Sequence, residues 1–220
     1  MLAWVRRQPS ALLLVAQLAG VLLYPFMETT DAGRALFSVF GILVLGLVLL
    51  AVRHSPAHTW VAVLLGLPAT CLLLIQAVSG SDDLLPYSSA FEAVLYFYAA
   101  GALIAYMLAD HEITRDELFA VGATFTLVAW GFAYTFIVVQ AIEPGSFTAA
   151  IDPAGDRSWM ELLYLSFTNL TSTGLSDVGP IEPFARSVVM IEQLAGLGYV
   201  VMLVSRLVAL TVLGGRARVD

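Results

Sequence analysis

The chain has 220 residues, of which 60% are hydrophobic and only 12% are charged. A soluble domain is about half apolar and a quarter charged, so this composition excludes an ordinary soluble protein. The formal net charge is −7, and the single cysteine, Cys71, cannot form a disulfide within the chain. The apolar residues come in blocks of membrane-spanning length, which indicates an integral membrane protein without room for a separate soluble domain. All ten basic residues are arginine, which we interpret as a codon bias typical of a prokaryote.

Four apolar segments occupy the first half of the chain. We expect the first helix to end at Pro25, because proline disrupts helix interiors. Ser55 and Pro56 predict the cap and the first turn of the third helix. Ser89 and Glu92 have the spacing of a capping box and predict the start of the fourth helix. The four helices are expected over residues 10–25, 34–52, 58–78 and 89–108.

The second half contains two further capping boxes, Thr114 with Glu117 and Ser158 with Glu161. The first of these boxes predicts a long apolar helix. The helix after Ser158 can only be short, because polar residues arrive by Thr168, and 10–12 residues cover about half of a ~30 Å hydrocarbon core. We therefore expect an all-α membrane protein with six transmembrane helices and a re-entrant half-helix between the last two. The second-half helices are expected over residues 115–142, 158–170 and 184–212.

The charges of the connecting segments predict the orientation. Because cytoplasmic segments carry an excess of arginine, both termini are expected in the cytoplasm of a multi-pass protein of the cell (plasma) membrane. The other side carries most of the acidic residues, which would raise the local concentration of cations. The basic side contains Arg6, Arg7, Arg53, Arg115, Arg206, Arg216 and Arg218. The acidic side contains only three arginines, Arg34, Arg157 and Arg186, with Glu28, Asp31, Asp82, Asp83, Glu143, Asp152, Asp156, Asp177 and Glu182.

The segment 164–180, YLSFTNLTSTGLSDVGP, is too polar for a membrane span and too apolar for an ordinary surface loop. Non-helical backbone at membrane depth is tolerated where protein buries it or where it lines a water-filled path. Its carbonyls and hydroxyls are ligands that replace the water of a partly dehydrated cation. The glycine at position 174 allows the positive φ that such a turn requires. The segment therefore predicts an ion pathway.

The same segment resembles the pore signature of the tetrameric potassium-channel superfamily, which reads roughly YFSFVTLTTVGYGDIVP. The following ARSVVMIEQLAGLGYVVMLVSRLVAL is similar to the inner helix of prokaryotic six-span, single-pore-loop members. The resemblance covers about residues 158–212. It implies a four-helix membrane scaffold over residues 1–110, which lacks the arginines of a voltage sensor, and a pore domain over residues 111–220.

When the family's residues are matched to this chain by position, the resemblance implies an ion-selectivity filter with a non-standard sequence. Leu175 and Ser176 stand where the family has Tyr and Gly, so the outer ion sites are expected to change. Ser176 must adopt a strained φ or alter the outer filter. Whether sodium passes as well as potassium stays open. The expected filter residues are Thr171, Ser172, Thr173, Gly174, Leu175, Ser176 and Asp177, with K⁺ or Na⁺ at Ser172, Thr173 and Gly174.

Three residues of the last helix are further candidates. Glu192 is an acid within a span, and it either takes part in function or supports the pore loop through hydrogen bonds. Gly196 and Gly198 form a gating hinge or allow close helix packing. One loop cannot surround an ion, so we expect a homotetramer in the lipid bilayer. We expect no cofactor beyond permeant K⁺ or Na⁺, no nucleic acid and no small-molecule substrate.

The leading hypothesis is a cation channel conducting potassium, and sodium if the altered filter admits it. The alternative is a non-conducting membrane sensor or structural subunit with the same fold. An enzyme is not expected, because no span carries a Ser/His pair, an Asp pair or a cluster of metal ligands. The single-glycine filter segments of the Trk/Ktr potassium transporters are also similar, but those proteins carry four pore repeats in one chain.

Overall fold

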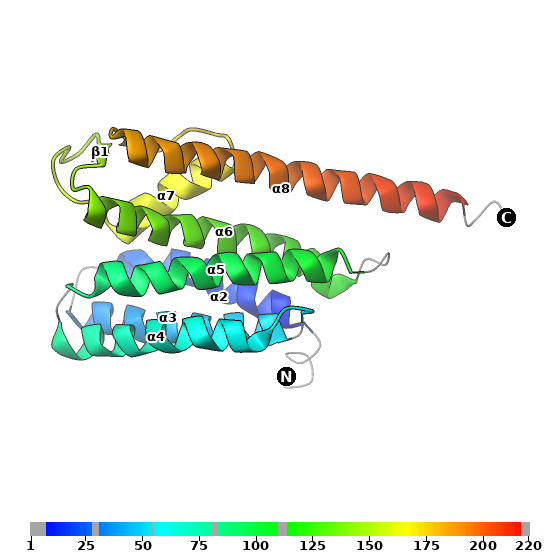
Figure 1. Ribbon diagram of the computed structural model, residues 1–220, viewed down its shortest axis with the longest axis horizontal. Helices are drawn as coiled ribbons and strands as arrows, with labels where there is room; N and C mark the ends of the chain where they lie inside the picture. The colour runs from blue at the N-terminus through cyan, green and yellow to red at the C-terminus, as the bar shows by residue number, and fades with distance from the viewer. Residues whose placement is uncertain (1–7, 28–30, 54, 81–82, 110–113, 217–220) are drawn as a thin grey trace.

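A computed structural model describes residues 8–27, 31–53, 55–80, 83–109 and 114–216. Arg6, Arg7, Glu28, Asp82 and Arg218, which entered the prediction of orientation, lie outside these residues. The described part of the chain is almost entirely helical, with two short strands (Figure 1). The elements are α2 (Pro9–Met27), α3 (Asp31–Arg53), α4 (Thr59–Ser79), α5 (Leu85–Met107), α6 (Arg115–Ile142), β1 (Phe147–Ala149), α7 (Trp159–Leu170), β2 (Val178–Pro180) and α8 (Pro183–Arg216).

Five helices are long and apolar enough to cross a membrane, which confirms a multi-pass membrane protein. They are α2, α4, α5, α6 and the first 24 residues of α8. In α3, the apolar segment Val39–Arg53 is shorter than a full span. The predicted helix over residues 115–142 is confirmed as α6, and the predicted short helix is confirmed as the 12-residue α7.

Helix α6 lies at the centre of the bundle and packs against α2, α5, α7 and α8. It runs parallel to α2, because Ser10 bonds Asp116 near the start of both helices and Gly20 lies against Trp130 farther along. The side chain of Trp130 is among the largest that are fully buried. Figure 1 shows α2–α5 on one side of α6, with the short α7 tilted between α6 and α8 on the other. Helix α8 therefore lies away from the first helices, whereas α7 reaches α2 through the contact of Trp159 with Tyr24.

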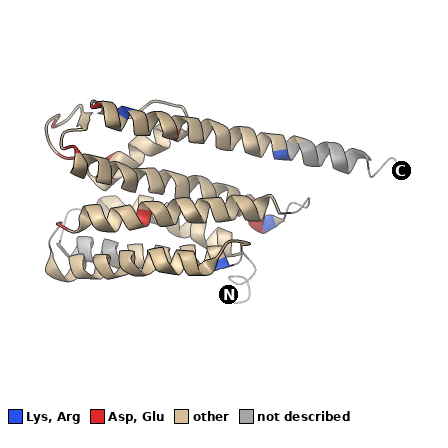
Figure 2. Ribbon diagram, in the orientation of Figure 1, with Lys and Arg blue, Asp and Glu red and all other residues tan. Residues whose placement is uncertain are grey.

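The charges of the described residues concentrate at the two ends of the bundle. An ion pair between Arg206 and Glu117, with a nitrogen–oxygen distance of 2.7 Å, ties α8 to the first turn of α6. Most acidic residues lie at the opposite end, beside β1 (Figure 2). The interior is largely free of charge, as the hydrocarbon core of a membrane demands.

Three predicted helix boundaries are wrong. Helix α2 continues through Pro25 to Met27, and a proline is tolerated in a membrane helix because neighbouring groups satisfy the freed backbone. Ser55 does not cap α4: its hydroxyl donates to the carbonyl of Val52 at the end of α3, and α4 begins after His58. Ser89 and Glu92 lie inside α5, which begins at Leu85.

The two strands form a feature that the sequence did not predict. β1 precedes α7, and β2 follows the polar segment after α7. The strands pair antiparallel, with Phe147 opposite Pro180 and Ala149 opposite Val178. The chain between them therefore begins and ends at one end of the bundle. Phe147 is buried against Phe136 of α6, which fixes the paired strands to the bundle.

Candidate functional site

The first turn of α7 is held by a complete capping box. The Ser158 hydroxyl accepts from the amide of Glu161, and the Glu161 carboxylate accepts from the amide of Ser158 at 2.7 Å. This confirms the predicted box. The preceding residue, Arg157, is buried, and its backbone exchanges two hydrogen bonds with the side chain of Gln140 on α6. The start of α7 is thus fixed to α6 before the polar segment begins.

Helix α7 ends in a tight reversal that starts the 171–177 loop. The carbonyl of Thr168 accepts from the amides of Thr173 at 2.9 Å and Gly174 at 3.2 Å. Gly174 has a φ of 63°, which is the positive value expected from the sequence. Ser172 has a φ of 57°, which the sequence did not predict. A residue with a side chain costs about 1–2 kcal/mol in this left-handed region of φ, so the backbone of the loop is strained at Ser172.

The hydroxyls of the loop are concentrated at its inner end. Thr171 Oγ1 donates to the carbonyl of Phe167 at 2.7 Å, and it lies 3.1 Å from Thr173 Oγ1. Residues 171–175 are all exposed in the single chain. The C-terminal end of α7, which carries a partial negative charge, directs its field at these residues. Together these features create a polar, electronegative surface suited to a cation.

The second half of the loop is held by one hydrogen bond from α7 and one from the first residue of β2. Leu175 is exposed, and its carbonyl accepts a hydrogen bond from the hydroxyl of Tyr164 at 3.2 Å. Ser176 is not among the described residues with positive φ, and its hydroxyl accepts from the amide of Val178 at 3.1 Å. The strained φ considered for Ser176 is therefore found at Ser172 instead. Tyr164 links α7 to the loop, a contact that the sequence did not predict.

Glu192 of α8 lies behind α7 and is fully buried. One of its carboxylate oxygens accepts from the Ser166 hydroxyl, and the other accepts from the Asn169 amide nitrogen at 2.8 Å. Both partners belong to the last two turns of α7. Of the two roles considered for Glu192, these contacts favour support of the loop.

Replacing Glu192 with alanine should destabilise the protein more than replacing it with glutamine. Alanine leaves the donors of Ser166 and Asn169 buried without acceptors, at about 1–3 kcal/mol each. Glutamine keeps one acceptor oxygen and the side-chain shape. The measurement is thermal stability in detergent, with Glu182→Ala as the control because Glu182 is partly exposed. Equal melting temperatures for both Glu192 variants and the wild type would contradict a supporting role.

Gly196 lies where α8 crosses the end of α7. A Cβ at this position would contact the backbone carbonyl of Leu170 and would lie 2.7 Å from its Cα. Gly198 faces open space, with nothing within 4 Å of an added Cβ. The structure therefore gives Gly196 a packing contact and Gly198 none within the single chain.

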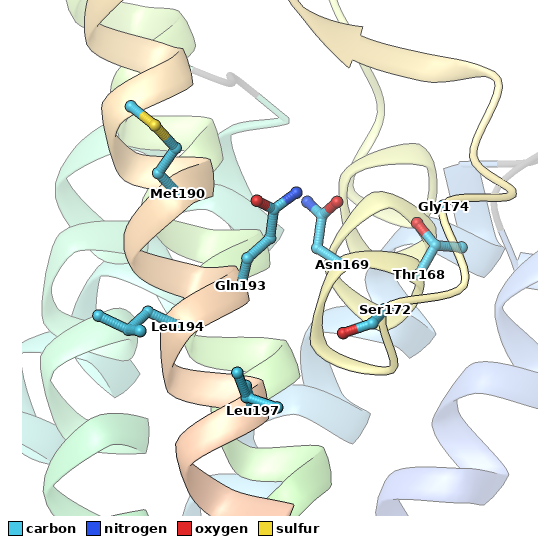
Figure 3. A pocket seen from close by; sticks show the side chains of 8 residues that line it. All are labelled: Thr168, Asn169, Ser172, Gly174, Met190, Gln193, Leu194 and Leu197. Atoms are coloured by element: carbon cyan, nitrogen blue, oxygen red, sulfur yellow. The ribbon is translucent and has the colours of Figure 1, made fainter.

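A pocket of about 520 Å³ lies between the end of α7, the loop and α8. Figure 3 shows the side chains of Gln193 and Asn169 pointing toward one another across it. The sequence did not single out either residue. Gln193 follows the predicted Glu192, and Asn169 lies two residues before the predicted Thr171, so the only available signal was a polar side chain within an apolar helix. The pocket is lined by Thr168, Asn169, Ser172, Gly174, Met190, Gln193, Leu194 and Leu197.

Helix α8 leaves an apolar surface uncovered beside this pocket. Its side chains at Leu194, Leu197 and Val201 are each more than half exposed. Of the predicted site residues, the structure brings Thr171–Ser176, Glu192 and Gly196 together around α7. Asp177 is exposed at the outer end of the loop, where β2 begins.

Residues 122–212 match the model of a protein family described as ion channel. The matched residues run from α6 through α7 and the 171–177 loop into α8, so they include the whole site. No curated protein and no solved structure matches the chain significantly. The match covers less than half of the chain, so what it shows is that this part of the membrane protein is similar to an ion-channel family.

Proposed function

We propose that the protein is a homotetrameric cation channel that conducts potassium through the 171–177 loop. The observation that carries this proposal is the geometry of α7: a helix too short to cross the membrane ends at a loop of hydroxyls. Twelve residues give a length of about 18 Å, against a ~30 Å hydrocarbon core. The pairing of β1 with β2 returns the chain to the end from which it entered. These features support a re-entrant pore helix.

Exposure of the loop supports a tetramer. Residues 171–175 are exposed in one chain, although non-helical backbone within a bilayer must be covered by protein or must line a water path. Four copies around a shared axis satisfy both demands, because the loops face the path and neighbouring chains cover their sides. The exposed apolar side chains of α8 supply part of this interface, and lipid covers the remainder.

Six membrane crossings, with α3 as one of them, are consistent with the alternating directions of the helices. In the antiparallel packing of α3 with α4, Gly41 lies near Leu73 and Gly66 lies near Leu49. Helix α3 has 23 residues, or about 34 Å, which suffices for a span. With α3 counted as a crossing, α2 begins and α8 ends on the side of Arg206. The positive-inside rule assigns this side to the cytoplasm and the 171–177 loop to the outer half of the membrane.

The proposed ion ligands are oxygens of residues 171–176, with the best sites at Ser172, Thr173 and Gly174. Ligands of this kind replace the water around an alkali ion, and there is no chemical step. The Asp177 carboxylate at the outer end attracts cations to the entrance. Leu175 and Ser176 alter the outer sites, so selectivity depends on the inner part of the loop. We expect potassium to pass faster than sodium, with sodium still measurable.

The proposal is tested by ion flux into liposomes that contain the purified tetramer. The comparison uses potassium, sodium and N-methylglucamine, which is too large to pass as a dehydrated ion. Potassium flux above sodium flux, with N-methylglucamine excluded, is the expected result. Equal potassium and sodium flux contradicts the expected selectivity but retains a cation channel. An assembled tetramer without flux of any ion contradicts conduction and favours a non-conducting sensor or structural subunit.

A further inference from the structure

A fully buried carboxyl group lies at the junction between the first helices and α7. Glu92 of α5 is 1% exposed and lies about 10 Å along the helix from its start at Leu85. Five aromatic side chains from four helices surround this part of the bundle, and all are buried. We call this group the junction cluster, and it consists of Tyr24, Glu92, Tyr96, Trp130, Tyr134 and Trp159.

Ring contacts connect the junction cluster to the first turn of α7. Trp159, the first residue of α7, lies 5.1 Å from Trp130 and 5.2 Å from Tyr24, measured between ring centroids. Tyr134 stacks on Tyr96 at 5.6 Å and lies 6.0 Å from Trp159. A displacement of Glu92, Tyr96 or Tyr134 is therefore transmitted through packed rings to the N-terminus of α7.

No ion pair joins Glu92 to any side chain that the structure describes. The arginine side chains that form ion pairs there, Arg157 and Arg206, pair with Glu161 and Glu117. Helices α2 and α4 contain no charged residue, and those of α3 and α6 lie in their terminal turns. The titratable groups that face the cluster are the hydroxyls of Tyr24, Tyr96 and Tyr134, which are neutral at physiological pH.

The hydrogen bonds available to Glu92 are also few. The Tyr134 hydroxyl interacts with its carboxyl, but neither carboxyl oxygen has a partner of ordinary hydrogen-bond geometry within the described ranges. The Tyr96 hydroxyl likewise lacks a partner there. An ionised carboxylate in such surroundings costs several kcal/mol or more. A metal ion does not explain the site, because the described residues contain no group of three His, Cys, Asp or Glu side chains that could hold one.

We propose that Glu92 is a proton-binding site that couples the first helices to α7. Glu92 holds a proton while the junction cluster is packed. Release of this proton at higher pH leaves a charge that the aromatic rings cannot accommodate, so the cluster loosens and the first turn of α7 moves. Packing is therefore complete at lower pH and is lost as pH rises. The coupling to ion conduction rests on the proposed function, whereas the proton site does not.

Infrared spectroscopy of the reconstituted protein tests whether Glu92 carries a proton. The wild type at neutral pH should show the C=O stretching band of a protonated carboxylic acid, and Glu92→Gln should lose this component. Asp156→Asn, which neutralises an exposed carboxylate, should leave the band unchanged. Tyr134→Phe should shift the band, because it removes the hydroxyl that contacts the acid. This second variant leaves Glu92 in place, so it provides a test even if Glu92→Gln does not fold. Identical bands in wild type and both cluster variants overturn the proposal.

Tryptophan fluorescence tests the coupling independently of conduction. With Trp4 and Trp60 replaced by phenylalanine, the remaining tryptophans, Trp130 and Trp159, both belong to the junction cluster. Emission should shift to longer wavelength as the pH rises, below the range in which tyrosine ionises, and Glu92→Gln should abolish the shift. An equal shift in both proteins, or none in either, overturns the coupling.

Flux measurements then separate this inference from the proposed function. Wild-type potassium flux should change at least twofold over the same rise in pH, and flux through Glu92→Gln should stay constant. A change of equal size in both proteins overturns regulation by Glu92. No flux at any pH in an assembled protein contradicts the proposed function, while the infrared band and the fluorescence shift still decide the proton site.

Discussion

Replacing Gly174 with valine is expected to abolish potassium flux and leave the assembled tetramer intact. Gly174 has a φ of 63°, a conformation that a β-branched residue adopts only at a cost of about 1–3 kcal/mol. The added Cβ meets nothing within 4 Å in the single chain, so the variant should fold. In the proposed tetramer four valine side chains and a distorted loop occupy the ion path. We therefore expect at least a hundredfold loss of flux.

The matched control is Gly179→Val. Gly179 also has nothing within 4 Å of an added Cβ, but it lies in β2, where valine is favourable and no positive φ is required. The measurements are flux into liposomes and size-exclusion chromatography of the detergent-solubilised assembly. Gly174→Val should elute with the wild type and pass no potassium, whereas Gly179→Val should elute with the wild type and still pass potassium. Wild-type flux through an assembled Gly174→Val variant would contradict the proposed path.

Sequence patterns predicted the elements whose signals are local. Thr114 and Ser158 each cap the helix that their spacing indicated, because the cap contact joins residues only three positions apart. The identical Ser-x-x-Glu spacing at Ser89 and Glu92 was misleading, since residues three apart also share one face of a helix interior. A proline near the start of α5 allowed the helix to begin at Leu85, before Ser89.

Features that depend on distant contacts were not predictable from the sequence. Three-residue strands such as β1 and β2 carry too little pattern to be recognised, and their pairing joins positions about thirty residues apart. The partners of Glu192 lie 23 and 26 residues away on α7, so the sequence alone left its role open. Strain at Ser172 arises from the reversal after α7, which no single residue type indicates. Gly174 was the exception, because positive φ has a known residue preference.

Replacing Gly196 with alanine is expected to reduce potassium flux at least tenfold and to lower the melting temperature. The new Cβ would overlap the backbone of Leu170, and backbone cannot move aside as a flexible side chain can. The end of α7 must therefore shift away from α8. Because Thr171 and Ser172 follow Leu170 directly, this shift displaces the inner end of the loop, where the proposed ion ligands lie.

Gly198→Ala is the matched control for Gly196→Ala, since both substitutions add one methyl group to the same helix two residues apart. Nothing lies within 4 Å of the Cβ at position 198, and alanine stabilises a helix interior by about 1 kcal/mol relative to glycine. If packing is the role of this part of α8, Gly198→Ala should keep flux and stability while Gly196→Ala loses both. If the glycines form a hinge, Gly198→Ala should lose flux while keeping its stability, because it removes backbone freedom without creating a clash. Thermal stability and flux measured on the same preparations therefore distinguish a hinge from a packing contact.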